Sequence, residues 1–158
     1  MNKTVKRPLS LLEILPQKPP MVLVDDFVWP KEGEQSVTSS VTITEDSPFY
    51  SSLLKGVPAC TVIEYMAQTM AIAVGIDHYL HDLPLSIGFL LGSRRLTLRV
   101  PFLPLGERYL ITAEPLFTDE SFGSFACEVK SAKTGDIVAS AQLTAFQPDA
   151  NFSGELPS

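Results

Sequence analysis

One long apolar segment, residues 57–76, constrains the fold of this chain more than any other. It has the length of a substantial helix and carries a single acidic residue, Glu64, near its start. A helix that is apolar on nearly all sides is normally buried. Burial of a carboxylate costs free energy and shifts its pKa unless a partner compensates. We therefore expect a central helix wrapped by other elements, with Glu64 as a candidate for chemistry.

Helical periodicity divides this segment into two faces. Small or polar residues share a side with Glu64, namely Cys60, Thr61, Gln68, Ala71 and Gly75. Apolar residues fill the opposite arc, namely Val62, Ile63, Met66, Ala67, Met70, Ala73 and Val74. The pattern predicts packing on one side and, on the other, a narrow slot with a carboxylate, a carboxamide and room for a ligand. The alternative is that Glu64 and Gln68 pair only with each other or with a partner chain.

The same segment is about as long as a membrane span, for which roughly 20 apolar residues are needed. Glu64, Gln68 and two threonines oppose insertion, since a central acid alone costs roughly 2.5–3.5 kcal/mol. A helix wrapped by a sheet is the better interpretation, and we expect no membrane span. Residues 1–8 carry charge but precede no apolar run, so we also expect no signal peptide.

Size and charge limit the classes of function. A chain of 158 residues fits one domain, expected over residues 1–148, with a loose polar tail over 149–158. The net charge of -6 argues against nucleic acid as a partner. The two cysteines, Cys60 and Cys127, lie in apolar stretches without metal-ligand spacing, so we expect no metal site. Both fit a reducing, cytoplasmic compartment.

The order of elements indicates an α+β fold. Ser10 and Glu13 have the spacing of a capping box, so a short helix is expected to begin there and to end before Pro16. Period-two patterns and turn residues predict strands over residues 21–29, 35–44, 86–100, 109–117, 124–132 and 137–146. Gly88 and Gly92 suggest bulges in the longest of these. We expect an antiparallel sheet curled around the helix, with its edges covered by pairing of two copies.

Four motifs follow one another along the chain. Residues 15–25 are Leu-Pro-Gln-Lys-Pro-Pro-Met-Val-Leu-Val-Asp, and residues 47–50 are Ser-Pro-Phe-Tyr. Residues 58–68 run from Pro-Ala to Glu-Tyr-Met-Ala-Gln, and residues 88–95 are Gly-Phe-Leu-Leu-Gly-Ser-Arg-Arg. In this order, over residues 12–148, the chain resembles the β-hydroxyacyl-acyl-carrier-protein dehydratases, which have the hotdog fold. It is most similar to the branch found in aryl-polyene biosynthetic clusters.

The resemblance implies a substrate, a site and a partner. The family dehydrates 3-hydroxyacyl thioesters held on the phosphopantetheine of an acyl carrier protein, without another cofactor. Its acidic residue and a histidine share the proton transfers across a dimer interface. By resemblance, Glu64 is the acidic residue, and the N–H groups around Ala59 and Cys60 bind the thioester carbonyl at the helix start. We accordingly expect a homodimer or a heterodimer of hotdog chains.

The histidine of this pair is missing. The family carries it in a loop before the helix, but residues 50–57 contain none, and Gln17 replaces the histidine of the opening motif. Gln17 can orient a carbonyl or hydroxyl group but cannot accept a proton at neutral pH. Tyr50, with an ordinary pKa of about 10, is a reluctant base. The candidate catalytic residues are therefore Glu64, with Gln17 or Tyr50 in support.

The chain's two histidines, His78 and His81, follow the apolar segment. They lie about 14 residues beyond Glu64, or roughly 20 Å along a helix, so they cannot face it in the same chain. We expect them to be solvated residues near a helix C-terminus, where a positive charge is favourable.

Three functions remain open at this point. The first is a dehydratase that uses Glu64. The second is an acyl-thioester hydrolase, in which one carboxylate activates water and the helix N-terminus holds the oxyanion. The third is a non-catalytic subunit that binds the acyl carrier protein or a partner chain, because the base has been lost.

Basic residues could dock an acidic carrier protein. Arg94, Arg95 and Arg99, with Lys55, are candidates to contact that protein or the phosphate of its phosphopantetheine. The alternative is a solvated strand edge. The substrate-binding candidates are thus Ala59, Cys60, Gln68, Arg94 and Arg95.

Overall fold

The computed structural model describes residues 9–148 of the chain. Its helical elements are α1 (Leu11–Ile14), the 3-10 turn η1 (Ala59–Thr61) and α2 (Val62–Leu80). Its strands are β1 (Asp26–Val28), β2 (Val37–Thr42), β3 (Gly56–Pro58), β4 (Phe89–Leu98), β5 (Phe102–Pro104), β6 (Arg108–Thr118), β7 (Phe122–Ser131) and β8 (Ile137–Phe146). The predicted tail over residues 149–158 lies outside the described residues.

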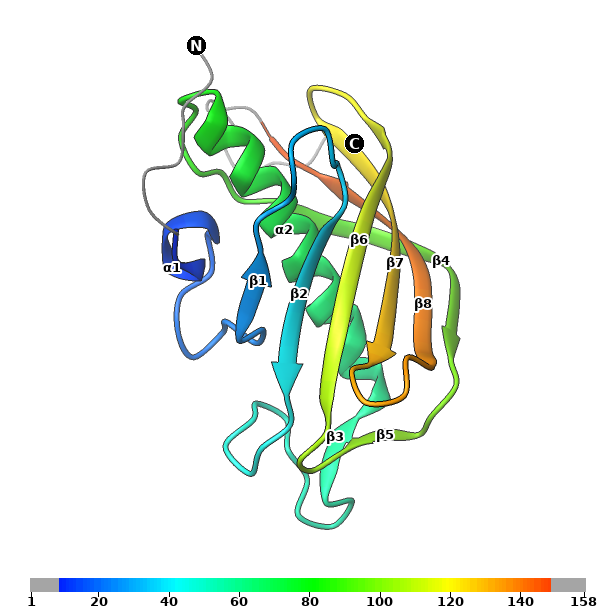
Figure 1. The fold of residues 1–158 in the computed structure, drawn as a ribbon. Helices are drawn as coiled ribbons and strands as arrows, with labels where there is room; N and C mark the ends of the chain where they lie inside the picture. Colours follow the sequence, from blue (N-terminus) through cyan, green and yellow to red (C-terminus); the bar gives the residue numbers. More distant parts are fainter. Residues whose placement is uncertain (1–8, 149–158) are drawn as a thin grey trace.

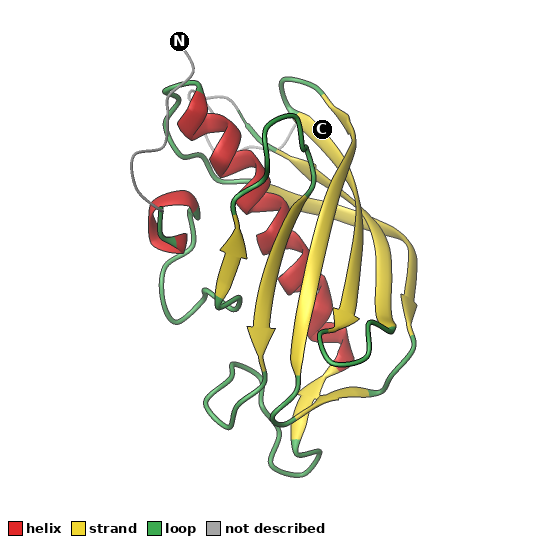
Figure 2. Ribbon diagram, in the orientation of Figure 1, coloured by secondary structure: helices red, strands yellow, loops and turns green. Residues whose placement is uncertain are grey.

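A curved antiparallel sheet surrounds the long helix. The strand order in this six-stranded sheet is β1-β2-β6-β7-β8-β4, and β3 pairs with β5 in a separate two-stranded sheet. Figures 1 and 2 show α2 lying diagonally along one face of the large sheet, with α1 beside its C-terminal half. The α+β fold with a sheet wrapped around one central helix is thereby confirmed.

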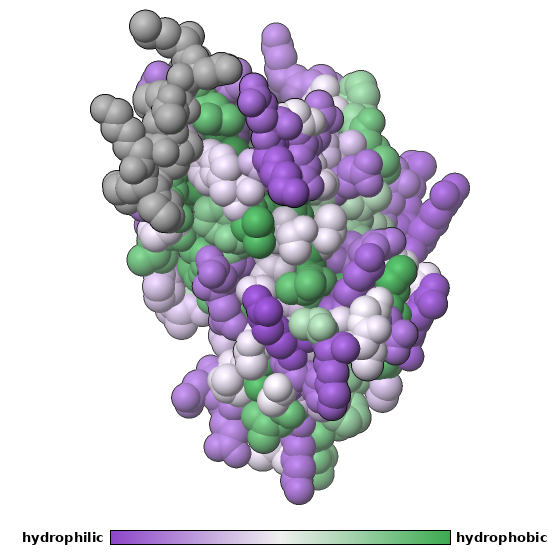
Figure 3. All heavy atoms as spheres, viewed as in Figure 1, coloured by the Kyte–Doolittle hydropathy of each residue, from purple (hydrophilic) through white to green (hydrophobic). Residues whose placement is uncertain are grey.

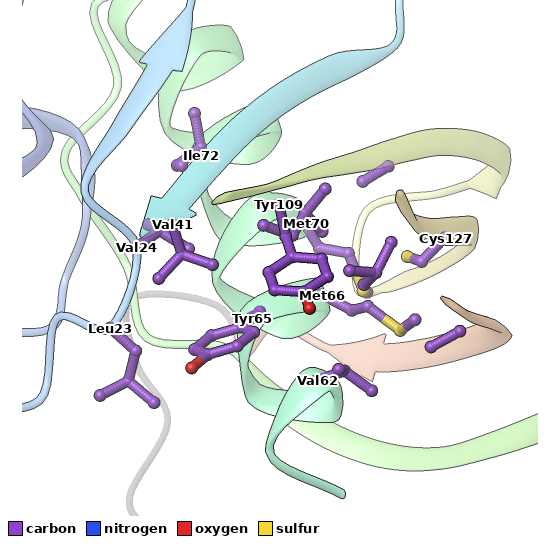
Figure 4. Close-up of a cluster of buried hydrophobic side chains, with 14 of the residues drawn as sticks. Leu23, Val24, Val41, Val62, Tyr65, Met66, Met70, Ile72, Tyr109 and Cys127 are labelled. Atoms are coloured by element: carbon purple, nitrogen blue, oxygen red, sulfur yellow. The ribbon is translucent and has the colours of Figure 1, made fainter. Parts of the chain in front are cut away.

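The core lies between α2 and the middle strands. Val62, Met66 and Met70 of α2 are buried in it, as the apolar arc predicts, and Figure 4 shows them in one cluster with Cys127 of β7. The other buried residues of β6 and β7 in this cluster are Tyr109, Ile111, Ala113, Phe125 and Val129. Their spacing of two along each strand is the alternation expected of a sheet with one buried face.

The rest of the predicted apolar arc is not fully buried. Ala73 and Val74 are half-buried and pack against the core, as predicted, whereas Ile63 and Ala67 are half-buried and are not part of it. The large sheet contacts α2 through β2, β6 and β7. Because this contact covers one side of the helix, a stripe on the other side stays accessible.

Long strands match their predicted ranges to within a few residues, whereas short ones do not. The strand predicted over residues 21–29 is reduced to β1, because the backbone of Leu23 is hydrogen-bonded to a helix side chain instead of a strand. The bulge predicted at Gly92 is confirmed by a register shift between Leu90 and Gly92, while Gly88 precedes the strand. Two strands, β3 and β5, are not predicted by the sequence pattern; each has three residues and ends in proline.

The long helix is an internal element. Within residues 9–148, one helical segment, over residues 59–80, is long and apolar enough to span a membrane, and 61% of that apolar window is buried inside the fold. Its contacts with β2, β6 and β7 make it the core helix of the sheet. On the face viewed in Figure 3, hydrophobic and hydrophilic residues are interspersed over the sheet.

Candidate active site

Glu64 lies in the first turn of α2 and borders a long groove. The groove has a volume of about 1400 Å³ and runs along α2, between the helix, the segment that follows α1 and the ends of β6 and β7. Glu64 is half-buried and is the lining residue nearest the start of α2. Ala67, Ala71 and Val74, also half-buried, continue the lining along the helix. A carboxylate thus stands at one end of a groove whose helix wall continues through Ala67, Ala71 and Val74 and reaches His78 near the other end.

The carboxamide of Gln68 fixes the position of Glu64. Gln68 is fully buried, and its Nε2 donates to Glu64 Oε1 at 2.9 Å and to the carbonyl oxygen of Met21 at 2.7 Å. Its Oε1 accepts the backbone N–H of Leu23 at 2.8 Å. Both N–H donors and the oxygen are therefore engaged by the protein. Gln68 is thus an anchor between Glu64 and a distant backbone segment, and a contact of Gln68 with substrate stays a prediction.

That segment, residues 14–23, forms a strap across α2. Its second contact is at Gly75, where a Cβ atom would lie 2.4 Å from the carbonyl oxygen of Ile14 and 2.5 Å from its Cγ2. Only glycine permits this approach. The strap covers Gln68, which is fully buried and does not line the groove, whereas Gly75 still borders the groove beside Ile14. Glu64 pairs with Gln68 as the alternative expected, but it also lines the groove, so the pairing is not its only contact surface.

Gln17 lies on the strap, between the residues that contact Gly75 and Gln68. It lines the same groove as Glu64 and is itself half-buried. Its Oε1 is buried, and no donor among the described residues reaches it. Buried polar atoms normally have a partner, so an unpaired one beside a groove calls for a functional explanation.

The start of the helix offers less than predicted for binding a carbonyl oxygen. The N–H of Ala59 donates to the carbonyl oxygen of Pro101 at 3.2 Å, and Ala59 is buried. This amide already has a partner within the chain, so its contact with substrate stays a prediction. Cys60 is exposed, and its N–H remains the candidate donor. Neither residue is in the lining of the groove.

The remaining candidates lie away from Glu64 within this chain. Tyr50 is half-buried and packs against the core, and it does not line the groove. Arg94 and Arg95 are exposed on β4, the strand at one edge of the large sheet. A register shift separates Arg94 from Thr97, and Arg95 has a positive φ of 55°. The two arginines are therefore displayed at an irregular point of the edge strand.

The histidines lie where the sequence predicts, at the far end of α2. His78 Nδ1 is 2.9 Å from the carbonyl oxygen of Pro84. His81 Nδ1 is 2.8 Å from the carbonyl oxygen of Asp77 and 3.3 Å from its Oδ1. No group of three or more metal-ligating side chains occurs among residues 9–148.

Two buried acids of the core, Tyr65 and Cys127, are held in their neutral forms. Burial, and to a lesser extent the charge of Asp25, raises the pKa of Tyr65 to about 12. Burial raises the pKa of Cys127 to about 12. Neither phenolate nor thiolate chemistry is accessible to these groups near neutral pH. Among the ionisable side chains of α2, Glu64, Asp77 and His78 line the groove, and Glu64 stands at the end nearest the start of the helix, where Gln68 holds it.

The fold and the sequence place this chain in a known class. Residues 9–156 match the model of the ApeP-like family, described as ApeP dehydratase. The chain is 30% identical to a chain in the structure of the dehydratase heterocomplex ApeI:P from Xenorhabdus doucetiae, over 91% of this chain and 94% of that one, with a TM-score of 0.83. The class defined by fold and site is thus the hotdog dehydratases, and within it this chain belongs to the ApeP-like dehydratase family. The predicted resemblance is confirmed.

More distant structures share the fold alone. An HP0420 homologue from Helicobacter felis is 11% identical over 92% of this chain and 93% of that chain, with a TM-score of 0.66. A hypothetical thioesterase from Streptococcus pneumoniae, solved with coenzyme A, is 11% identical over 78% of this chain and 84% of that chain, with a TM-score of 0.57. No curated protein sequence matches this chain significantly.

Proposed function

We propose that this chain dehydrates 3-hydroxyacyl groups carried as thioesters on the phosphopantetheine of an acyl carrier protein. The observation that carries the proposal is a half-buried carboxylate, Glu64, fixed by a fully buried carboxamide and bordering a groove long enough for an acyl chain. Membership of a dehydratase family supports this reaction over others.

One carboxylate can serve both proton transfers. Glu64 accepts the proton next to the thioester carbonyl, and the electron pair moves to form the carbon–carbon double bond. The hydroxyl then leaves with the proton that Glu64 returns, giving water, a 2-enoyl thioester and the original carboxylate. The carbonyl oxygen gains negative charge in the transition state, and we propose the N–H of Cys60 at the helix start as the donor that stabilises it.

A second hotdog chain is the expected partner. β4 is one edge of the large sheet, so its outer backbone groups have no partner strand. All ten residues of β4 are also exposed. Its exposed apolar residues are Phe89, Leu90, Leu91, Leu96 and Leu98. Long apolar edge strands pair with another chain unless they are blocked. The related structure is a heterocomplex of two dehydratase chains, which supports pairing of this kind.

The acyl carrier protein is proposed to dock near the irregular part of β4. Arg94 and Arg95 are both exposed there, and side chains on the faces of a strand leave its backbone edge free for pairing. Guanidinium groups bind phosphate and carboxylate groups well. Since the whole chain carries a net charge of -6, an acidic carrier protein needs such a local basic surface.

A second candidate function is a non-catalytic subunit of a hotdog heterodimer. The observation that favours it is the position of the two histidines, which lie at the opposite end of α2 from Glu64. In that arrangement this chain would bind the acyl thioester or the partner while the other chain performs the chemistry.

The test is to incubate the purified chain with 3-hydroxyacyl carrier protein and to follow the mass of the carrier. Loss of water that disappears in Glu64→Gln supports the dehydratase. The glutamine is a matched variant, because its carbonyl oxygen still accepts from Gln68 while the carboxylate is gone. Release of free acid would instead indicate a hydrolase, and retention without turnover would indicate the non-catalytic subunit.

A further inference from the structure

The strap contains a polar atom that its own structure does not use. Gln17 Oε1 is buried and has no donor among the described residues. The other buried carboxamide of this region, Gln68, has partners at both its oxygen and its nitrogen. Both side chains lie on or against the same strap, so the lack of a partner is particular to Gln17 and is not a property of the whole region.

The position of Gln17 is fixed from both sides. Ile14 packs against Gly75, and the carbonyl oxygen of Met21 accepts from Gln68, so the residues between them are held along one stretch of α2. Gln17 therefore enters the groove at the level of the helix turn between Gln68 and Gly75. Glu64 borders the same groove one turn before Gln68. A ligand that reaches from Glu64 along the groove passes Gln17.

The chemistry of a carboxamide oxygen determines what it selects. It accepts hydrogen bonds and cannot donate one. A hydroxyl group on an acyl chain would pair with it, whereas a methylene or a ketone would leave it unpaired. Sites that contain a buried polar group discriminate against ligands that lack its partner. One hydrogen bond between the ligand and such an oxygen raises the affinity for the ligand by roughly tenfold.

We propose that Gln17 is a specificity-determining residue that selects acyl chains bearing a hydroxyl group, through a hydrogen bond from that hydroxyl to its Oε1. The inference rests on the proposed function, in which the groove binds acyl thioesters. Through Gln17, the groove prefers hydroxyacyl chains over saturated and oxoacyl chains. Gln17 itself transfers no proton.

The test measures binding of four pantetheine thioesters by calorimetry, namely 3-hydroxyoctanoyl, 5-hydroxyoctanoyl, octanoyl and 3-oxooctanoyl. The full chain carries Glu64→Gln to prevent turnover. We expect at least one hydroxylated ligand to bind roughly tenfold more tightly than the octanoyl and oxo ligands. The two hydroxyl positions establish which carbon lies beside Gln17.

Two further variants isolate the hydrogen bond. Gln17→Leu keeps similar bulk and removes the acceptor, so the preference for hydroxylated chains should vanish while the affinity for octanoyl pantetheine is unchanged. Gln142→Leu is the control. Gln142 lies on β8, and its carboxamide donates to the hydroxyl of Ser124 on the neighbouring strand β7. Gln142 does not line the groove. The control variant should keep the preference, and a circular dichroism melt confirms that each variant is folded.

The outcomes separate the two proposals. Equal binding of all four thioesters, or a preference that survives Gln17→Leu, would overturn the role of Gln17 and leave the proposed function standing. A preference for the oxo ligand would also overturn it, since a ketone offers no donor. Absence of binding by any thioester would overturn both.

Discussion

Glu64 is a functional candidate because its surroundings hold it in one place while leaving it accessible. A surface carboxylate would be free to rotate, and a fully buried one would be closed to substrate. Here one oxygen is bonded to Gln68, which is bonded to the backbone of the strap. Catalytic groups need this kind of support from neighbouring residues.

Replacing Gln68 tests that support. Gln68→Met keeps the volume but removes the partners of the Leu23 N–H, the Met21 carbonyl and Glu64. Buried backbone groups left unpaired cost about 1–3 kcal/mol, so we expect a loss of about 2–4 kcal/mol in the free energy of unfolding. Urea unfolding measures it. Gln142→Met is the matched control and should change the free energy by less than about 1 kcal/mol, because its side chain is only half-buried. Equal effects of the two variants would contradict the anchoring role.

The buried phenol and thiol make the free energy of unfolding depend on pH in the alkaline range. The pKa values of Tyr65 and Cys127 are both raised to about 12, against ordinary values of 10.0 and 9.0. The unfolded chain therefore releases these protons first as pH rises. Their contribution to stability is complete below about pH 9 and is lost between pH 9 and 12. Unfolding free energies measured from pH 8 to pH 11 should fall, and Cys127→Ala should lessen the fall; a flat profile would contradict this.

At the level of elements, the strap and α2 form one unit. Gly75 allows the carbonyl oxygen of Ile14 to approach the helix closely. The strap then supplies the backbone groups that hold Gln68 and, through it, Glu64. This arrangement explains why residues 21–25 are not a strand, although their composition favours one.

Gly75→Ala should displace the strap. The added Cβ would overlap backbone atoms of Ile14, which cannot move aside as a flexible side chain can. We expect a loss of about 1–3 kcal/mol in unfolding free energy, together with reduced turnover of the 3-hydroxyacyl thioester. Gly88→Ala is the control, since its nearest atom would be 3.8 Å away. If Gly75→Ala is as stable and active as the control, the close contact is unimportant.

Sequence periodicity could predict the helix, the long strands and Glu64, because these depend on local patterns. It could not predict the strap, whose hydrogen bonds join Gln68 to residues more than 40 positions away. Helical spacing placed Gln68 and Gly75 beside Glu64 correctly, yet another segment covers Gln68 and packs against Gly75. The two short strands were missed because Pro58 and Pro104 argue against strand structure.

At the level of the whole molecule, the exposed edge of β4 supports our proposal that the functional unit contains two hotdog chains. An isolated sheet of this kind would expose a row of unpaired backbone groups together with apolar side chains. Pairing at β4 would also bring a second chain close to the basic residues Arg94 and Arg95.

The double variant Leu91→Lys, Leu96→Lys should weaken this pairing, because like charges on both copies or an unpaired charge at the partner's edge oppose association. Sedimentation velocity should detect a shift from dimer to monomer, or loss of the heterodimer with a partner chain. Leu53→Lys is the control: Leu53 is 92% exposed and lies outside β4, so the assembly should be unchanged. A dimer that persists in the double variant would show that another surface forms the interface.

The most direct test of the whole account is hydrogen exchange at the carbon next to the thioester carbonyl. Deuterium exchange into a saturated acyl pantetheine in D₂O requires only a base and a hydrogen-bond donor to the carbonyl oxygen. No hydroxyl leaves, so the exchange tests Glu64 as a base without any need for the histidine that the chain lacks. We predict that the wild-type chain incorporates deuterium, detected by mass spectrometry, and that Glu64→Gln lowers the rate by at least about 10²-fold. Equal rates for the two proteins, or no exchange above the uncatalysed background, would contradict the assignment of Glu64 as the base.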